Sequence, residues 1–221
     1  AYSNEAINVG TVTITVTGKG NYKGQKQVSY EILPKTIDSV DSKIKVEKPA
    51  DVTYNGKSQK QKPVVKDEAT NATLTENVDY TLAYSNEAIN VGTVTITVTG
   101  KGNYKGQLSA EYQITQGSFI VDPIEKVPYN GRPQVIDPVV RDKVTGNQLV
   151  KDVDYTLTYE GDTTNVGKVT IKVKGKGNYA GNVEVSYEII AKSISDANSG
   201  IKVDPIPDVP YTGEEQKVKP V

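Results

Sequence analysis

Residues 1–25 read AYSNEAINVGTVTITVTGKGNYKGQ, and the same stretch recurs without change at residues 83–107. A diverged third version, TYEGDTTNVGKVTIKVKGKGNYAGN, occupies residues 158–182. The versions are displaced by 82 and then by 75 positions. This period is too long for a solenoid whose repeat is one small supersecondary unit, and it is long enough for each repeat to bury a core of its own.

The middle of the repeat predicts a half-buried strand. Residues 11–17 read TVTITVT, with valine and isoleucine on one face and threonine on the other, and this alternation is typical of a strand with one face in a core. In the third version, residues 168–174, the apolar positions persist while two threonines become Lys172 and Lys174. Because lysine is seldom buried, the comparison between versions assigns the threonine face to solvent.

The same alternation recurs along each repeat, and no stretch carries a sustained helical stripe of apolar residues. About six or seven strands per repeat is the number expected of a small immunoglobulin-like sandwich. We therefore predict an all-β fold of tandem immunoglobulin-like β-sandwich repeats arranged end to end, each made of two packed antiparallel sheets or a close variant of that arrangement. The other expected strands are residues 28–32, 110–114, 185–189, 80–84, 155–159, 44–46, 52–54, 64–65 and 139–140.

A second landmark, Tyr-x-Gly, sets the phase of the repeat, because it recurs with the same spacing at residues 54–56, 129–131 and 211–213. The sequence then divides into four units. We name them copy 1 (1–34, the later part of a repeat), copy 2 (35–116, complete), copy 3 (117–191, complete) and copy 4 (192–221, the earlier part of a repeat).

The seven-residue difference between the two displacements lies near the start of the repeat. Residues 38–46 and 196–203 carry extra positions that residues 119–125 lack, which indicates adjustment at the junctions between copies. The two partial copies predict that the sequence is an excerpt from a longer array, without a leader at its start.

The amino-acid composition excludes two kinds of partner, nucleic acid and the membrane interior. The chain has 26 Lys and Arg against 27 Asp and Glu, with the two signs interspersed, so no face for neutralising phosphates is expected and nucleic acid is excluded as a partner. No apolar run approaches the roughly 18 residues that span a bilayer, so no membrane insertion is expected.

Among the possible classes of function, the sequence supports enzymatic catalysis least. The chain has neither histidine nor cysteine, which removes Ser-His and Cys-His nucleophiles and the usual zinc sites. Paired carboxylates for glycoside hydrolysis have no fixed spacing and stay open, but near-duplicate repeats offer no unique pocket. We predict that the protein is not an enzyme, with no catalytic residues and no cofactor.

Three motifs have a functional and a structural interpretation. Residues 18–24, GKGNYKG, resemble a nucleotide loop, but the glycine spacing differs and no helix follows, so a structural turn is favoured. Tyr54, Tyr129 and Tyr211 are either sugar-stacking platforms or tyrosines that pack against the sandwich edge, and recurrence in every copy favours packing.

Two acidic pairs near junctions are a weak hypothesis for calcium, since they lack a dense acidic loop. These pairs are Asp38 with Asp41 and Asp204 with Asp208.

The order of the motifs resembles a known family. Tyr-[Asn/Thr]-Gly is followed by Val-Asp-Tyr-Thr-Leu (78–82 and 153–157), Asn-Val-Gly, Gly-Lys-Gly-Asn-Tyr-x-Gly and a closing Tyr-x-Ile. This set resembles the bacterial Ig-like repeats of large Gram-positive surface proteins, over nearly the whole chain. The resemblance implies a secreted, cell-wall-anchored protein of the adhesin type, in which such repeats form a stalk below a separate binding head.

The function expected from the sequence is therefore structural: a stalk or spacer that projects a binding head from the cell wall. The alternative is a glycan- or host-protein-binding Ig-like adhesin module, with unknown ligand-binding residues. Expected partners are neighbouring repeats of the same chain and a host glycan or protein bound through another domain. Head-to-tail self-association through the ends is also expected, because residues 1–34 and 192–221 leave strand edges unpaired.

Overall fold

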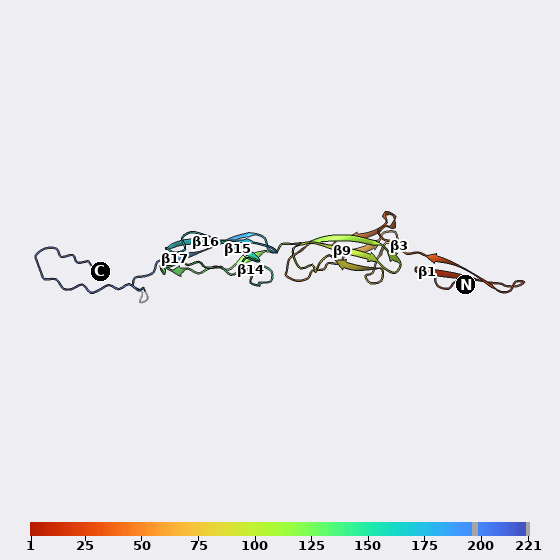
Figure 1. Cartoon of the computed structure of the whole chain (residues 1–221), viewed down its shortest axis with the longest axis horizontal. Helices are drawn as coiled ribbons and strands as arrows, with labels where there is room; N and C mark the ends of the chain where they lie inside the picture. Colours follow the sequence, from red (N-terminus) through yellow and green to blue (C-terminus); the bar gives the residue numbers. More distant parts are fainter. Residues whose placement is uncertain (196–198, 220–221) are drawn as a thin grey trace.

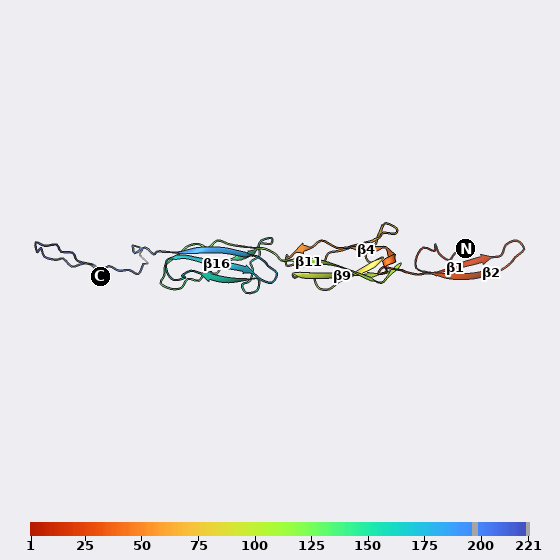
Figure 2. The same ribbon diagram turned by 90° about the horizontal axis from the view of Figure 1, so that it is seen from above.

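The fold is all-β, as the alternating pattern predicts. The computed structural model describes residues 1–195 and 199–219, and within them one 3-10 turn and no α-helix occur. Figures 1 and 2 show the chain as an elongated body in which copies 1 to 4 follow one another in single file. The hairpin of copy 1 and the C-terminal segment lie at opposite ends in both views.

Copy 1 is an antiparallel hairpin of β1 (Gly10–Thr17) and β2 (Gln25–Ile32). The strands pair from Gly10 opposite Ile32 to Thr17 opposite Gln25. Val12 is the one apolar residue of the hairpin that is fully buried, while most of its other apolar side chains reach solvent.

Copy 2 contains a sheet of strand order β4-β6-β7 and a sheet of order β5-β11-β9-β8, with β3 paired to β10. Their bounds are β3 (Lys35–Thr36), β4 (Ile44–Glu47), β5 (Val52–Thr53), β6 (Val64–Asp67), β7 (Ala72–Thr73), β8 (Tyr80–Tyr84), β9 (Gly92–Gly100), β10 (Tyr104–Lys105) and β11 (Gln107–Thr115).

Copy 3 repeats this arrangement with fewer strands: the larger sheet has the order β13-β17-β16-β15, and β12 pairs with β14. Their bounds are β12 (Phe119–Val121), β13 (Val127–Pro128), β14 (Val140–Asp142), β15 (Tyr155–Glu160), β16 (Gly167–Gly175) and β17 (Asn182–Ile190). In copy 4, the described residues 192–195 and 199–219 form no strand and are nearly all exposed.

The named strands pair antiparallel except at three places. β5 runs parallel to β11, β13 runs parallel to β17, and β3 runs parallel to β10. The alternation of side chains marks which face of a strand is buried, but it carries no information on the direction of the neighbouring strand. All three pairings join segments more than fifty positions apart in the sequence.

The central strands bury their valine and isoleucine faces, as predicted. In copy 2, Val98 and Ile96 lie in two clusters, and the first cluster takes residues from both sheets. In copy 3 a single cluster surrounds Val169, Ile171 and Val173. Lys172 and Lys174 lie on the exposed face of β16, as the comparison between repeats indicated. Burial of such side chains is the main source of stability in each copy.

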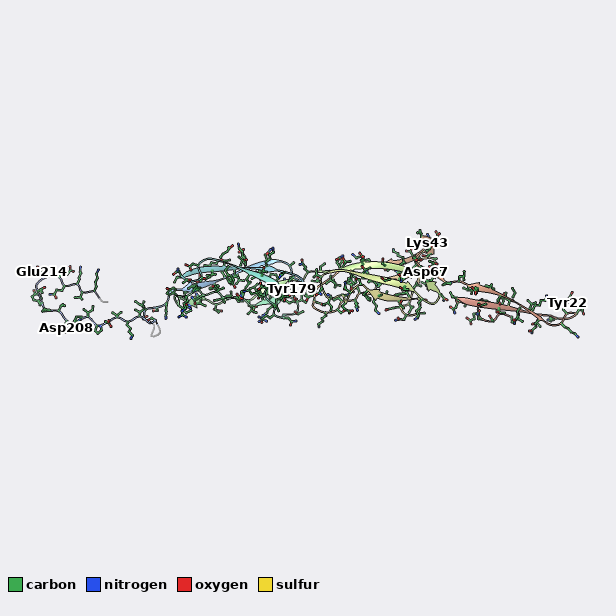
Figure 3. The ribbon with its side chains drawn as sticks, in the orientation of Figure 1. Tyr22, Lys43, Asp67, Tyr179, Asp208 and Glu214 are labelled. Carbon is green, nitrogen blue, oxygen red and sulfur yellow. The ribbon has the colours of Figure 1, made fainter. Side chains whose placement is uncertain are left out.

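The extra residues of copy 2 form an excursion between β3 and β4. Residues Val40–Ser42 make a 3-10 turn (η1) capped by the Ser39 side chain, and Lys43 follows in the left-handed region with a φ of 57°. Figure 3 places Lys43 on a turn that projects from the body. The corresponding extra positions at 196–203 include residues 196–198, which lie outside the described residues.

Candidate functional site at the joints between copies

Copies 1 to 3 each carry the turn GKGNY, which we call the Asn loop; it comprises residues 18–24, 100–106 and 175–181. In copy 2 the Gly100 N–H donates to the Gly106 carbonyl at 2.9 Å, and the Lys101 ammonium donates to the Asn77 carbonyl at 2.8 Å. Copy 3 repeats both contacts, at 2.9 and 2.6 Å. These bonds hold the loop in one shape and leave its asparagine facing the preceding copy.

At the first joint, the Asn loop of copy 2 binds copy 1. The Val9 N–H donates to Oδ1 of Asn103 at 2.9 Å, and Nδ2 of Asn103 donates to Oδ1 of Asn8 at 2.9 Å. The Asn103 carbonyl accepts from the Lys35 N–H at 2.9 Å. One residue therefore contacts the preceding copy through its side chain and the linker through its backbone.

The second joint repeats the same contacts. The Val91 N–H donates to Oδ1 of Asn178 at 3.0 Å, and Nδ2 of Asn178 donates to Oδ1 of Asn90 at 3.1 Å. The Asn178 carbonyl accepts from the Gly117 N–H at 2.9 Å. We call this pair of side-chain bonds the Asn clasp. Its occurrence at both joints makes it a property of the repeat.

A glycine with positive φ follows each Asn-Val pair. Gly10, Gly92 and Gly167 have φ values of 138°, 140° and 155°, a region that other residues rarely adopt. This turn leads directly into the central strand of each copy and presents the preceding valine N–H at the end of the copy. The Asn-Val-Gly motif is thereby the receiving half of the clasp.

The second joint also contains a tyrosine contact. The ring of Tyr54 meets the ring of Tyr179 edge-on, with centroids 5.5 Å apart and planes at 82°, an arrangement that is favourable for aromatic pairs. Tyr179 is only 6% exposed and belongs to the core of copy 3, so Tyr54 of copy 2 packs against that core. Nε2 of Gln116 donates to the Tyr179 carbonyl at 3.3 Å. Figure 3 places Tyr179 where the two central copies meet.

The tyrosines predicted as either sugar platforms or packing residues differ in their surroundings. Tyr54 is half-buried, with its ring packed against Tyr179 of the following copy. Tyr129, at the equivalent position of copy 3, is 37% exposed, and Tyr211 in copy 4 is 94% exposed. The exposure of this tyrosine therefore depends on whether another copy packs against it.

Tyr179 connects the joint to a buried carboxylate. Its hydroxyl donates to Oδ2 of Asp142 at 2.9 Å, while Oδ1 of Asp142 accepts from the Val144 and Thr145 N–H groups at 2.8 and 2.7 Å. Burial on its own would raise the pKa of Asp142, but these hydrogen bonds, with Thr145 the strongest, outweigh it and lower the pKa. Burial first, and then the bond to Asp142, raise the pKa of Tyr179.

We expect copy 3 to lose stability in acid through Asp142. A carboxylate whose pKa is depressed by folding stabilises the fold fully above its unfolded value of about 3.9, and that contribution disappears as the pH falls through the lower folded value. Circular dichroism melts from pH 7 to pH 2 should show the loss below about pH 4. Asp142→Asn, which cannot ionise, should reduce the acid dependence of copy 3; an unchanged dependence would exclude Asp142 as its source.

In copy 2 the equivalent carboxylate is held by a different group. Nζ of Lys35 lies 2.6 Å from Oδ2 of Asp67, whose side chain is 3% exposed. Asp67 also accepts from the Ala69 N–H at 3.0 Å. Lys35 is the first residue of copy 2, so in this copy the buried carboxylate is fastened to the start of the copy.

The four acidic residues considered for calcium are all exposed. Asp38 and Asp41 lie on the excursion, and Asp204 and Asp208 are exposed in copy 4. Within residues 1–195 and 199–219, no three acidic side chains come together where they could hold a metal ion. In the same residues no helix is long and apolar enough to cross a bilayer.

We expect Asn178→Ala to loosen the second joint without unfolding either copy. The variant removes both side-chain bonds of the clasp, each worth about 1 kcal/mol, while the tyrosine contact stays. NMR relaxation should show copies 2 and 3 tumbling more independently, with their melting temperatures little changed. Asn21→Ala is the matched control, because Asn21 lies on the same loop but its side chain makes no hydrogen bond to another copy among the described residues; an equal effect of both variants would contradict the clasp.

No family model matches the sequence, and no curated protein matches it significantly. Among solved structures, extracellular cadherin domains 1–4 of protocadherin gamma B7 align over 85% of this chain and 59% of theirs, with 9% identity and a TM-score of 0.26. The cis-dimer structure of protocadherin gammaB7 EC3-6 aligns over 84% and 57%, with 13% identity and a TM-score of 0.23. The chain spans less than two thirds of these structures, and the TM-scores are too low to support an argument from them.

Sequence reasoning explained the Asn loop as a turn and missed its contact with the preceding copy. The signal was present: asparagine occupies the same loop position as Asn21, Asn103 and Asn178, in a loop that varies at one position. A turn of this kind requires only its glycines. The asparagine retained between them therefore indicated a hydrogen-bonding partner for its side-chain amide. The partner motif Asn-Val was retained as well.

Proposed function

We propose that the chain is a stalk region of a bacterial cell-surface adhesin, built of tandem immunoglobulin-like sandwiches joined end to end. The stalk belongs to an extracellular protein anchored to a Gram-positive cell wall, and it projects a separate binding head. The observation that carries the proposal is the Asn clasp, which occurs in the same form at both joints and holds successive copies in line.

The proposal is supported by how the copies connect. The linkers are short, since β11 ends at Thr115 and Gly117 already bonds to the Asn loop of copy 3. The buried clusters of the described residues stay within single copies, apart from Tyr54. A chain of this kind gains length with every added copy while each copy folds by itself.

Pulling the chain from its two ends tests the proposal. Single-molecule force spectroscopy should show two separate unfolding events, for copies 2 and 3. Each should release about 230–260 Å of chain, the extended length of one repeat less its folded length. One event for the whole chain would refute the stalk. Saturable binding of the chain to a glycan or host-protein array would favour a binding module instead.

A further inference from the structure

The parallel pairings of copies 2 and 3 join the segment that enters each copy to the segment that leaves it. In copy 2, β3 pairs in parallel with β10, which directly precedes the last strand, and β5 pairs in parallel with the end of that last strand, β11. In copy 3, Gly117 forms a parallel bridge to Tyr179, and β13 pairs in parallel with the end of β17. The first and last segments of both copies therefore lie side by side and run in the same direction.

This arrangement determines how tension acts on a copy. Figures 1 and 2 show the copies in single file, with the long strands lying along the body. Tension along the chain pulls the first segment of a copy backwards and its last strand forwards. Because the two segments run parallel, they must slide along each other, and their hydrogen bonds are loaded together. Antiparallel terminal strands would instead be pulled apart from one end, one bond at a time.

Side chains reinforce the pairing of β5 with β11 in copy 2. The Tyr54 N–H donates to the Thr115 carbonyl at 2.8 Å, and Oγ1 of Thr115 donates to the Val52 carbonyl at 3.2 Å. Oδ1 of Asp51 accepts from the Gln113 N–H at 2.9 Å. This last bond is the main cause that lowers the pKa of Asp51, so the acceptor is an ionised carboxylate and the bond is charge-assisted.

The first residue of copy 2 is held by its backbone and by its side chain. The Lys35 N–H donates to the Asn103 carbonyl at 2.9 Å, and the Ile37 N–H donates to the Lys105 carbonyl at 2.7 Å. The Lys35 ammonium also lies 2.6 Å from the buried carboxylate of Asp67 on β6. Tension that enters copy 2 at Lys35 is therefore resisted by an ion pair as well as by backbone bonds.

Three residues carry the side-chain bonds of these pairings in copy 2, namely Lys35, Asp51 and Thr115, and the equivalents in copy 3 are Gly117, Lys126 and Ile190. Glycine has no side chain, an ammonium cannot accept an N–H, and isoleucine has no polar side-chain atom. The backbone bonds persist, from Gly117 to the Asn178 carbonyl at 2.9 Å and from Tyr129 to the Ile190 carbonyl at 2.8 Å. Copy 3, which the structure describes throughout, therefore keeps the backbone geometry without these three side-chain bonds.

We propose that the parallel pairings form a shear clamp that sets the tension at which each copy unfolds, and that Lys35, Asp51 and Thr115 make the clamp of copy 2 the stronger one. The inference rests on the proposed stalk function, in which tension is the working load. As tension rises, copy 3 unfolds first and lengthens the stalk while copy 2 stays folded. This order does not follow from the cores, since copy 3 has one continuous buried cluster and copy 2 has two smaller ones.

Pulling the whole chain at constant force, from its two ends, tests the order of unfolding. Copy 2 (35–116) is seven residues longer than copy 3 (117–191), so its unfolding releases about 24 Å more extended chain and identifies it. We expect the shorter release first in most traces. The reverse order, or no preferred order, overturns the clamp and leaves the stalk proposal standing. A single event for the whole chain refutes the stalk and the clamp together.

Asp51→Ala tests one bond of the clamp. Forced unfolding is governed by the unfolding rate, and loss of this bond should raise the rate of copy 2 about tenfold at the same force. In urea without tension, where unfolding need not begin at the terminal strands, the rate should change less. Glu68→Ala is the matched control, because this exposed carboxylate of copy 2 lies outside the clamp and is 3.8 Å from Lys45. Equal effects of the two variants, or equal rate changes with and without tension, overturn the role of Asp51.

The reciprocal variant transfers the bond to copy 3. Lys126→Asp with Glu188→Gln places the residue types of Asp51 and Gln113 at the equivalent positions, where β13 and β17 have the same register as β5 and β11. Circular dichroism confirms that the variant is folded before it is pulled. Unfolding of copy 3 should slow about tenfold at the same force; a folded variant that unfolds at an unchanged rate overturns the assignment of clamp strength to this bond.

Discussion

Replacing Ile171 with alanine is expected to unfold copy 3 at a temperature about 10–25 °C lower while copy 2 melts as before. The Ile171 side chain is 0% exposed at the centre of the copy 3 cluster. Its truncation should cost about 2–4 kcal/mol, from the lost burial and from the cavity left behind. Because the clusters of copies 2 and 3 are separate apart from Tyr54, the loss should stay within one copy.

Differential scanning calorimetry measures this effect as a separation of the two unfolding transitions. Ile96→Ala is the matched variant, since Ile96 occupies the same repeat position in copy 2 and is also 0% exposed; it should shift the other transition. Lys172→Ala, on the exposed face of β16, should change either transition by less than about 0.5 kcal/mol. A single transition that moves as a whole in both core variants would mean that the copies share one cooperative core.

Asp142→Ala is expected to destabilise copy 3 by about 3 kcal/mol. The carboxylate is buried and accepts three hydrogen bonds, one from Tyr179 and two from the backbone of the following turn. Its removal leaves the Tyr179 hydroxyl without this acceptor and frees the turn. Since Tyr179 also packs on Tyr54, the second joint should loosen together with the copy.

Urea unfolding of the variants, followed by circular dichroism, separates these contributions. Tyr179→Phe removes one hydrogen bond and keeps the ring, so it should cost about 1–2 kcal/mol and leave the tyrosine contact in place. Glu184→Ala removes an exposed carboxylate from β17 and should have little effect. If Asp142→Ala were no more destabilising than Glu184→Ala, the buried carboxylate would have no structural role.

The strands and their buried faces could be predicted because the repeat supplies its own comparison. Where one copy has threonine and another has lysine, the position faces solvent; where valine and isoleucine persist, it faces a core. Residues 93–99 of β9 and 168–174 of β16 illustrate this. Val94, Ile96 and Val98 in the first stretch are 0% exposed, as are their equivalents in the second. The turn predicted for residues 18–24 from the spacing of their glycines is confirmed, because the stretch connects β1 to β2.

The remaining features depend on contacts between distant segments. The parallel partner of β11 is a two-residue strand, β5, too short to show alternation. The excursion at Val40–Ser42 is specified by a serine cap and a left-handed Lys43, which the sequence does not distinguish from an ordinary loop. The clasp joins Asn8 to Asn103, which lie 95 positions apart, more than one repeat period, and only a comparison of which amides persist could have suggested it.

The repeated sequence places both halves of a joint in each of copies 1 to 3. The Asn loop faces the preceding copy, and the Asn-Val-Gly turn faces the following one, so identical repeats join without any specialised linker. The buried carboxylate beside each joint is held by Tyr179 in copy 3 and by Lys35 in copy 2. The repeat thus tolerates a change of partner at this position while the clasp stays the same.

Small-angle X-ray scattering of the dilute chain tests the central claim most directly. Copies in single file, with nine-residue strands about 30 Å long, give a body of about 100 Å or more and a radius of gyration near 30 Å. A globular body of the same number of residues has a radius of gyration near 17 Å. We expect the larger value and a rod-like distance distribution; a value close to 17 Å would contradict separate copies joined end to end.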